Sequence, residues 1–126
     1  MDTTSTLTLS QARTLRQLEE ALKVTGTHTL LDVVNAIKRN EAVFFQRHDT
    51  IVVAEIRTFP QKTVLHFWVA AGDLGEVEAL MPEIETWGRK QGATMAEAIG
   101  RAGWMKAAKK HGYKPQAALY LKDLRQ

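Results

Sequence analysis

The hydrophobic residues of this chain change their spacing twice, and these changes limit the fold more than any other sequence feature. Over the first forty residues, leucines and valines recur every three or four positions, which predicts helices at 10–24 and 29–40. Thr29 and Asp32 have the spacing of a capping box at the start of the second helix. The next thirty residues are rich in β-branched and aromatic side chains. They predict an antiparallel meander of three strands, at 42–47, 50–59 and 63–71.

After the meander the apolar residues return to helical spacing. A helix is expected at 74–92, and because Pro82 lies inside it, this helix either kinks there or divides into two. The last part of the chain predicts a strand at 93–99, a helix at 103–111 and a final strand at 116–121. The order is therefore two helices, three strands, helix, strand, helix and strand (ααβββαβαβ).

This order predicts an α/β (α+β) domain with three layers, in which a mixed central sheet contains the antiparallel meander. Apolar and polar residues alternate only weakly at 63–71, so this strand is expected to be central and covered on both faces. A length of 126 residues suits one domain. We therefore expect a single domain over 1–126, with a flexible N-terminus at 1–9.

Composition narrows the classes of function. The chain has no cysteine, which excludes disulfides and thiolate metal sites, and its four histidines lack metal-ligand spacing, so no metal is expected. The uncharged run at 63–72 is too short to span a bilayer, and the first ten residues do not resemble a signal peptide. A cytoplasmic protein is expected. The net charge of +3 permits an anionic ligand without requiring one.

Five short segments stand out in order along the chain. They are Gly-Thr-His-Thr-Leu-Leu-Asp-Val at 26–33, Ala-Ala-Gly-Asp-Leu at 70–74, Pro-Glu-Ile-Glu-Thr-Trp at 82–87, Gly-Arg-Ala-Gly-Trp at 100–104 and His-Gly-Tyr at 111–113. In this order they resemble the GCN5-related N-acetyltransferases, in the compact form encoded by tailed phages and prophages. The resemblance extends over about 26–124 and implies that family's fold, in a host-cell cytoplasm or associated with a virion.

The resemblance implies a site for acetyl-CoA at the turn after the central strand. In that family the turn and the following helix direct backbone N–H groups at the cofactor's pyrophosphate. The corresponding residues here are Ala71, Gly72, Asp73, Leu74 and Gly75. Gly72→Val is then expected to remove cofactor binding without unfolding the domain. The family's Gly-x-Gly loop is not in register, and Asp73 and Glu76 add negative charge, so Asp73 could instead cap the helix.

Two strand residues are candidates for the general base of an acetyl transfer, Glu55 and His66, since either could take a proton from an amine. Each could equally be a structural polar residue of a strand. The family's closing helix carries a tyrosine that serves as the general acid. Its position is Ala108 in this chain, and Tyr113 is interpreted as a core aromatic residue.

Arg101 is the remaining candidate for binding the cofactor, because glycines at 100 and 103 allow tight bends around it and its guanidinium suits phosphate. The competing interpretation is a structural ion pair with Glu85 or Glu97, and the missing tyrosine favours this second arrangement slightly. Lys106, Lys109 and Lys110 follow in the closing helix. They are interpreted as a solvent-exposed face, so binding to nucleic acid is not expected.

Two hypotheses of function remain. The first is an N-acetyltransferase-like domain that binds acetyl-CoA and transfers acetyl to an unknown amine. The second is a non-catalytic virion or phage accessory protein that uses the same fold to contact a phage or host protein. The leucine stripe of the first helix, at 10–24, is narrow enough to serve either the domain's own core or a homodimer contact.

Overall fold

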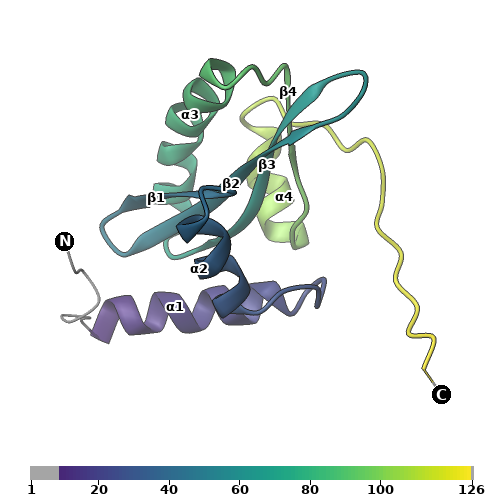
Figure 1. The fold of residues 1–126 in the computed structure, drawn as a ribbon. Coiled ribbons are helices and arrows are strands. Elements are labelled where there is room, and N and C mark those ends of the chain that lie inside the picture. The colour runs from purple at the N-terminus through teal and green to yellow at the C-terminus, as the bar shows by residue number, and fades with distance from the viewer. Residues whose placement is uncertain (1–8, 126) are drawn as a thin grey trace.

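The computed structural model describes residues 9–125, and its elements follow the predicted order up to the last helix (Figure 1). The predicted flexible N-terminus lies outside the described residues except for Leu9, where the first helix begins. The elements are α1 (Leu9–Leu22), α2 (Leu30–Lys38), β1 (Val43–Arg47), β2 (Thr50–Thr58), β3 (Thr63–Ala71), α3 (Leu74–Lys90), β4 (Met95–Ala98) and α4 (Ala102–Lys109).

The sheet has the order β1-β2-β3-β4. The first three strands form the predicted antiparallel meander, whereas β4 pairs parallel with β3, so the sheet is mixed. In the register, Glu55 of β2 lies opposite His66 of β3, and His66 lies opposite Glu97 of β4. The strand β3 is central, as its weak alternation predicted.

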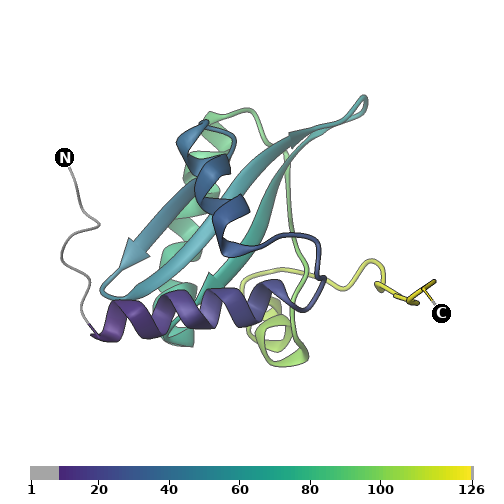
Figure 2. The same ribbon diagram turned by 60° about the horizontal axis from the view of Figure 1, so that its bottom comes forward.

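Helices cover both faces of the sheet and make three layers (Figures 1 and 2). On one face, Leu18 and Leu22 of α1 and Val33 of α2 pack against Val53 and Val69 of the sheet. The leucine stripe of α1 therefore serves the core of its own domain, which answers the question that the sequence left open. The other face is covered by α3 and α4. Their contacts with the sheet include Val77, Leu80, Ile84 and Trp104 against Val52, Ala54 and Leu65.

The ends and interiors of the helices follow local chemistry. Thr29 and Asp32 form the predicted capping box, with the Thr29 N–H donating to Asp32 Oδ2 at 2.8 Å and the Asp32 N–H donating to Thr29 Oγ1 at 3.2 Å. α3 is one helix of 17 residues with Pro82 inside it. Gly88 of α3 is buried against β3, and a Cβ there would lie 3.0 Å from Leu65 Cδ2.

The predicted final strand at 116–121 is wrong. Between α4 and residue 125 the chain forms no further helix or strand, and Figure 1 shows it leaving the body of the molecule towards the C-terminus. A strand requires a neighbour that pairs with its backbone, and its own residues supply only the preference for extended structure. The apolar residues of the segment stay exposed, among them Leu119, Tyr120, Leu121 and Leu124.

Candidate functional site

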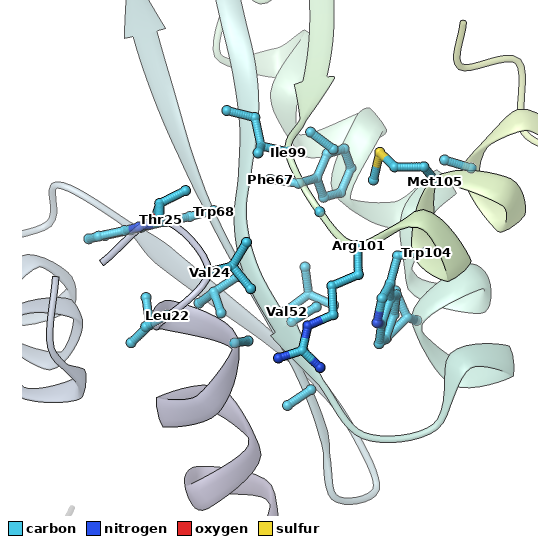
Figure 3. Close-up of a pocket in the computed structure, with 18 of the residues that line it drawn as sticks. Leu22, Val24, Thr25, Val52, Phe67, Trp68, Ile99, Arg101, Trp104 and Met105 are labelled. Atoms are coloured by element: carbon cyan, nitrogen blue, oxygen red, sulfur yellow. The ribbon is translucent and has the colours of Figure 1, made fainter. Parts of the chain in front are cut away.

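A cavity of about 890 Å³ opens between the two layers of helices, beside the end of β3. Its wall includes residues from α1 and the loop after it, from β3, from the start of α3, and from the segment leading into α4. Figure 3 shows Leu22 and Val24 on one side of this space and Trp104 on the other. Elements that are far apart in sequence therefore meet at the carboxyl end of the central strand, where ligands bind in open α/β sheets.

The turn that the sequence assigned to cofactor binding lies partly on this cavity. Ala71, Gly72 and Leu74 line it, whereas Asp73 and Gly75 are not among its lining residues. Gly72 has a φ of +122°, and a Cβ there would lie 2.5 Å from Thr50 Oγ1 and 2.7 Å from Thr50 Cα. A side chain at this position would displace the β2 backbone. This geometry predicts that Gly72→Val disturbs the fold, against the expectation from the sequence that the domain stays folded.

Side-chain oxygens surround the first turn of α3. Asp73 is the N-cap and accepts from the Glu76 N–H at 3.0 Å, which confirms the capping interpretation. The Asp73 N–H donates to Thr50 Oγ1 at 3.0 Å, and that hydroxyl donates to Glu76 Oε1 at 2.7 Å. The Glu76 carboxylate also contacts His48 Nδ1. The hydrogen bond from Thr50 lowers the pKa of Glu76, so this helix end carries negative charge at neutral pH.

Arg101 does not have the structural role that the sequence slightly favoured. It is exposed, and among residues 9–125 neither Glu85, Glu97 nor any other group forms an ion pair or hydrogen bond with its side chain. Glu85 instead accepts from the Tyr113 hydroxyl, and Glu97 contacts His66 and Arg57. Arg101 is the N-cap of α4 and lines the cavity. Figure 3 shows its guanidinium pointing into the space between α1 and α4.

The structure brings both candidate bases, Glu55 and His66, into one row of ionisable side chains across three strands. His66 is 4% exposed, and its Nδ1 lies 2.8 Å from Glu97 Oε2. Arg57 joins the row from β2, with its Nε 2.5 Å from Glu55 Oε1 and its Nη1 3.5 Å from Glu97 Oε2. His66 and Arg57 line the large cavity, whereas Glu55 lines a smaller cavity of about 270 Å³ beside α2.

The surroundings of His66 make it a neutral base. Burial lowers its pKa below the ordinary value of 6.5, Arg57 lowers it further, and Glu97 acts in the opposite direction. Because an ionised carboxylate only accepts hydrogen bonds, the contact with Glu97 places the ring proton on Nδ1. Nε2 then keeps its lone pair and is the atom that could take a proton.

Two positions bear on a general acid for the proposed transfer, Ala108 and Tyr113. Ala108, which stands at the position of the family's tyrosine, is buried and lines the cavity, so no hydroxyl is present there. Tyr113 also lines the cavity, but its hydroxyl donates to Glu85 Oε2 at 2.6 Å. Burial and this hydrogen bond raise its pKa, which makes it a weak acid. Tyr113 packs edge-on against Phe67, as a core aromatic residue does.

Sequence reasoning missed several residues around this cavity. Trp68 of β3 meets His28 of the α1–α2 loop edge-on at 4.9 Å between ring centroids, and both line the cavity. Arg13 and Arg16 line it from the exposed side of α1. A sequence pattern shows that such residues share a helix face, but only the packing of α1 over the end of β3 brings them to a cavity.

Three further expectations concern the described residues only. Lys106, Lys109 and Lys110 are exposed, as the solvated-face interpretation requires, and whether they bind nucleic acid stays untested. Between residues 9 and 125 no three histidine or carboxylate side chains are grouped as metal ligands would be, and the absence of a metal stays a prediction. Within the same range no helix has the length and apolar character of a membrane span.

Solved structures share this architecture. A probable acetyltransferase superposes with a TM-score of 0.62 at 10% identity, covering 95% of both chains. An acetyltransferase from Trypanosoma brucei gives 0.63 at 16% identity, over 91% of this chain and 93% of that one. Glucosamine-6-phosphate N-acetyltransferase from Arabidopsis thaliana gives 0.61 at 13% identity, over 94% and 95%. The chain has the acetyltransferase fold.

This result confirms the fold that the short segments of the sequence indicated. No protein-family model matches the chain, and no curated protein matches its sequence significantly. At identities of 10–16% the acetyltransferase fold is the common property, and chemistry must be argued from the residues of the site.

Proposed function

We propose that this protein binds acetyl-CoA in the large cavity and transfers its acetyl group to an amine. The acetyltransferase fold supports this proposal. The observation that carries it is that His66 and Arg101 line the same cavity. His66 is a neutral base held by Glu97, and Arg101 is an exposed cation without a partner among residues 9–125. The base suits an amine, from which it could take a proton, and the cation suits the phosphates of an anionic cofactor.

The size of the cavity suits acetyl-CoA, and one side of the cavity has a positive charge that suits the cofactor's phosphates. A volume of about 890 Å³ lies within the usual range for small-molecule sites, and the wall is largely apolar around Phe67 and Trp104. Arg101 would contact phosphate oxygens. The carboxylates of Asp73 and Glu76 lie at the start of α3. We therefore expect this helix end to contribute less to phosphate binding than a helix N-terminus without acidic side chains.

Bound acetyl-CoA would supply the acetyl group as an activated thioester. The chain's own residues would then prepare the amine, which attacks only in its unprotonated form. His66 would take the amine's proton at Nε2, while Glu97 holds the ring in the required tautomer through Nδ1. Arg57 anchors Glu97 from the neighbouring strand and lowers the pKa of His66.

Binding of acetyl-CoA to Arg101→Ala tests the cofactor site. Because the Arg101 side chain forms no hydrogen bond or ion pair within residues 9–125, its loss should leave the melting temperature within a degree or two of wild type. Affinity should fall about 10- to 100-fold, the loss expected for one charged hydrogen-bonding group. Isothermal titration calorimetry with acetyl-CoA measures both proteins.

Lys106→Ala is the matched control, because Lys106 is another exposed cation of α4 that does not line the cavity. It should bind acetyl-CoA like wild type. An equal loss in both variants would show a general charge effect and contradict the site. No heat and no thermal shift for wild type at millimolar acetyl-CoA would contradict the function itself.

That negative result would favour the second candidate, a non-catalytic phage accessory protein that uses the fold for protein contacts. Two observations support this candidate: Ala108 offers no proton donor, and carboxylates surround the start of α3. The phage or prophage origin, the host cytoplasm or virion as location, and the extent of the single domain stay predictions under either candidate.

A further inference from the structure

Two arginines of α1 lie on the wall of the large cavity without a carboxylate partner. Arg13 and Arg16 are exposed, and neither forms an ion pair within residues 9–125. They are three positions apart on one helix, so their positive charges are neighbours and repel each other. The first turn of α1 has no acidic residue that would balance them. The helix gains no stability from this pair of cations, which points to a ligand.

The other charged side chains of the cavity wall already have partners. These contacts are Arg57 Nε with Glu55 Oε1 at 2.5 Å, Lys23 Nζ with Glu20 Oε1 at 3.0 Å and His111 Nε2 with Glu78 Oε1 at 2.8 Å. Arg13, Arg16 and Arg101 remain, and within residues 9–125 none of the three is in an ion pair. The wall of the cavity therefore has an excess of positive charge that only a bound anion would balance.

The start of α3 is poorly suited to bind that anion. Its Asp73 N–H donates to Thr50 Oγ1, and its Glu76 N–H donates to Asp73 Oδ2, each at 3.0 Å. The carboxylates of Asp73 and Glu76 would also repel a phosphate at this helix end. Leu74, the first residue of α3, lines the same cavity as the two arginines of α1. The unpaired guanidinium groups are thus the better phosphate ligands of this cavity.

Arg101 approaches the same space from the opposite side. It precedes α4, and Figure 3 shows its guanidinium pointing towards α1. A guanidinium binds phosphate through two parallel N–H donors. Cations on both sides of one cavity suit a ligand that has phosphates at more than one position. Acetyl-CoA is such a ligand, because it carries a pyrophosphate and a separate 3′-phosphate.

We propose that Arg13 and Arg16 of α1, together with Arg101, bind the phosphates of acetyl-CoA in place of the start of α3. This inference rests on the proposed function and names the residues that would select a donor with a nucleotide. His66 and Gly72 both line the cavity, and six residues of strand place them about 20 Å apart along β3. The long pantetheine arm of acetyl-CoA suits this separation between the base and the phosphates.

Calorimetric titration with acetyl-CoA tests the assignment. Arg13→Gln/Arg16→Gln should lower the affinity about 100-fold, because it removes two charged hydrogen-bonding groups. Its melting temperature should equal or exceed that of wild type, since the repulsion between the two arginines is lost. Lys38→Gln/Lys62→Gln is the matched control, because it removes two exposed lysines that do not line the cavity. This control should bind acetyl-CoA like wild type.

Two fragments of the cofactor show whether the effect concerns the phosphates. Adenosine 3′,5′-bisphosphate has phosphates and no thioester, whereas S-acetylpantetheine has the thioester and no phosphate. Arg13→Gln/Arg16→Gln should bind the first fragment about 10-fold more weakly than wild type, or weaker still. It should bind the second fragment as wild type does. An equal loss for both fragments would contradict a phosphate site, because the variant would then have altered the cavity as a whole.

Two further outcomes would overturn this inference and leave the proposed function standing. One is an unchanged affinity of Arg13→Gln/Arg16→Gln for acetyl-CoA. The other is an equal loss of affinity in Lys38→Gln/Lys62→Gln, which would show a general effect of charge. A wild-type protein that does not bind acetyl-CoA would contradict the proposed function itself, and this inference with it.

Discussion

His66 shows how one residue can be both part of the core and part of a site. Its sequence context, between Leu65 and Phe67, suits a buried strand residue, and the side chain is indeed 4% exposed. Yet it lines the large cavity and is held by Glu97 at 2.8 Å. Burial disfavours the charged ring, and a base that stays neutral is ready to accept a proton.

We predict that acetyl transfer depends on His66 and that Glu97 sets its pH dependence. The rate should fall as the pH drops below the pKa of His66, which lies under 6.5, because the protonated ring cannot act as a base. Glu97 raises that pKa, so Glu97→Gln should move the acid limb of the rate profile to lower pH. The plateau rate should also fall about 10-fold or more as the ring loses its orientation.

The measurement follows release of the CoA thiol with a panel of primary amines, in a chain that contributes no thiol of its own. His66→Gln should lose the transfer while it still binds acetyl-CoA. An acid limb that is the same in wild type and Glu97→Gln would contradict the role of Glu97 as a positioning residue.

Both close packing and a positive φ require glycine at position 72. We predict that Gly72→Ala costs more than about 3 kcal/mol of unfolding free energy, because its Cβ would meet Thr50 at 2.5 Å as well as requiring a positive φ. Gly92→Ala is the matched control, since Gly92 has a φ of +92° but nothing within 4 Å of its Cβ position. It should cost about 1–2 kcal/mol, the conformational part alone. If urea unfolding gave equal losses of unfolding free energy for Gly72→Ala and Gly92→Ala, the packing against Thr50 would contribute nothing.

At the scale of elements, the contact of α3 with β3 determines how closely one helical layer approaches the sheet. Replacing glycine by alanine inside a helix usually stabilises it by about 1 kcal/mol. We predict the opposite sign for Gly88→Ala, a loss of about 1–3 kcal/mol, because the new methyl group would lie 3.0 Å from a Leu65 side chain that is only 2% exposed.

Gly103→Ala in α4 provides the comparison, because nothing lies within 4 Å of its Cβ position. This variant should be stabilised, and thermal or urea unfolding of both variants gives the sign directly. Stabilisation by Gly88→Ala would mean that α3 can move away from the sheet without cost.

At the scale of the whole molecule, the candidate site belongs to no single element. α1 contributes Arg13 and Arg16, β3 contributes His66 and Trp68, and the residue before α4 contributes Arg101. The parallel pairing of β4 with β3 brings Glu97 beside His66, although 31 residues separate them in the chain. The mixed sheet thus brings the candidate base beside its carboxylate partner, and residues of both helical layers line the cavity next to it.

The sequence by itself determined the elements up to α4 and their order, because hydrophobic spacing, caps and turn residues act over a few positions. It also located the turn at Gly72 and both candidate bases. Only the tertiary structure decided what these residues contact. It showed that Arg101 has no carboxylate partner among residues 9–125, that Glu97 belongs to His66, and that Gly72 packs against Thr50. It also left residues 116–121 without a strand partner, since β pairing depends on a neighbour that local sequence does not specify.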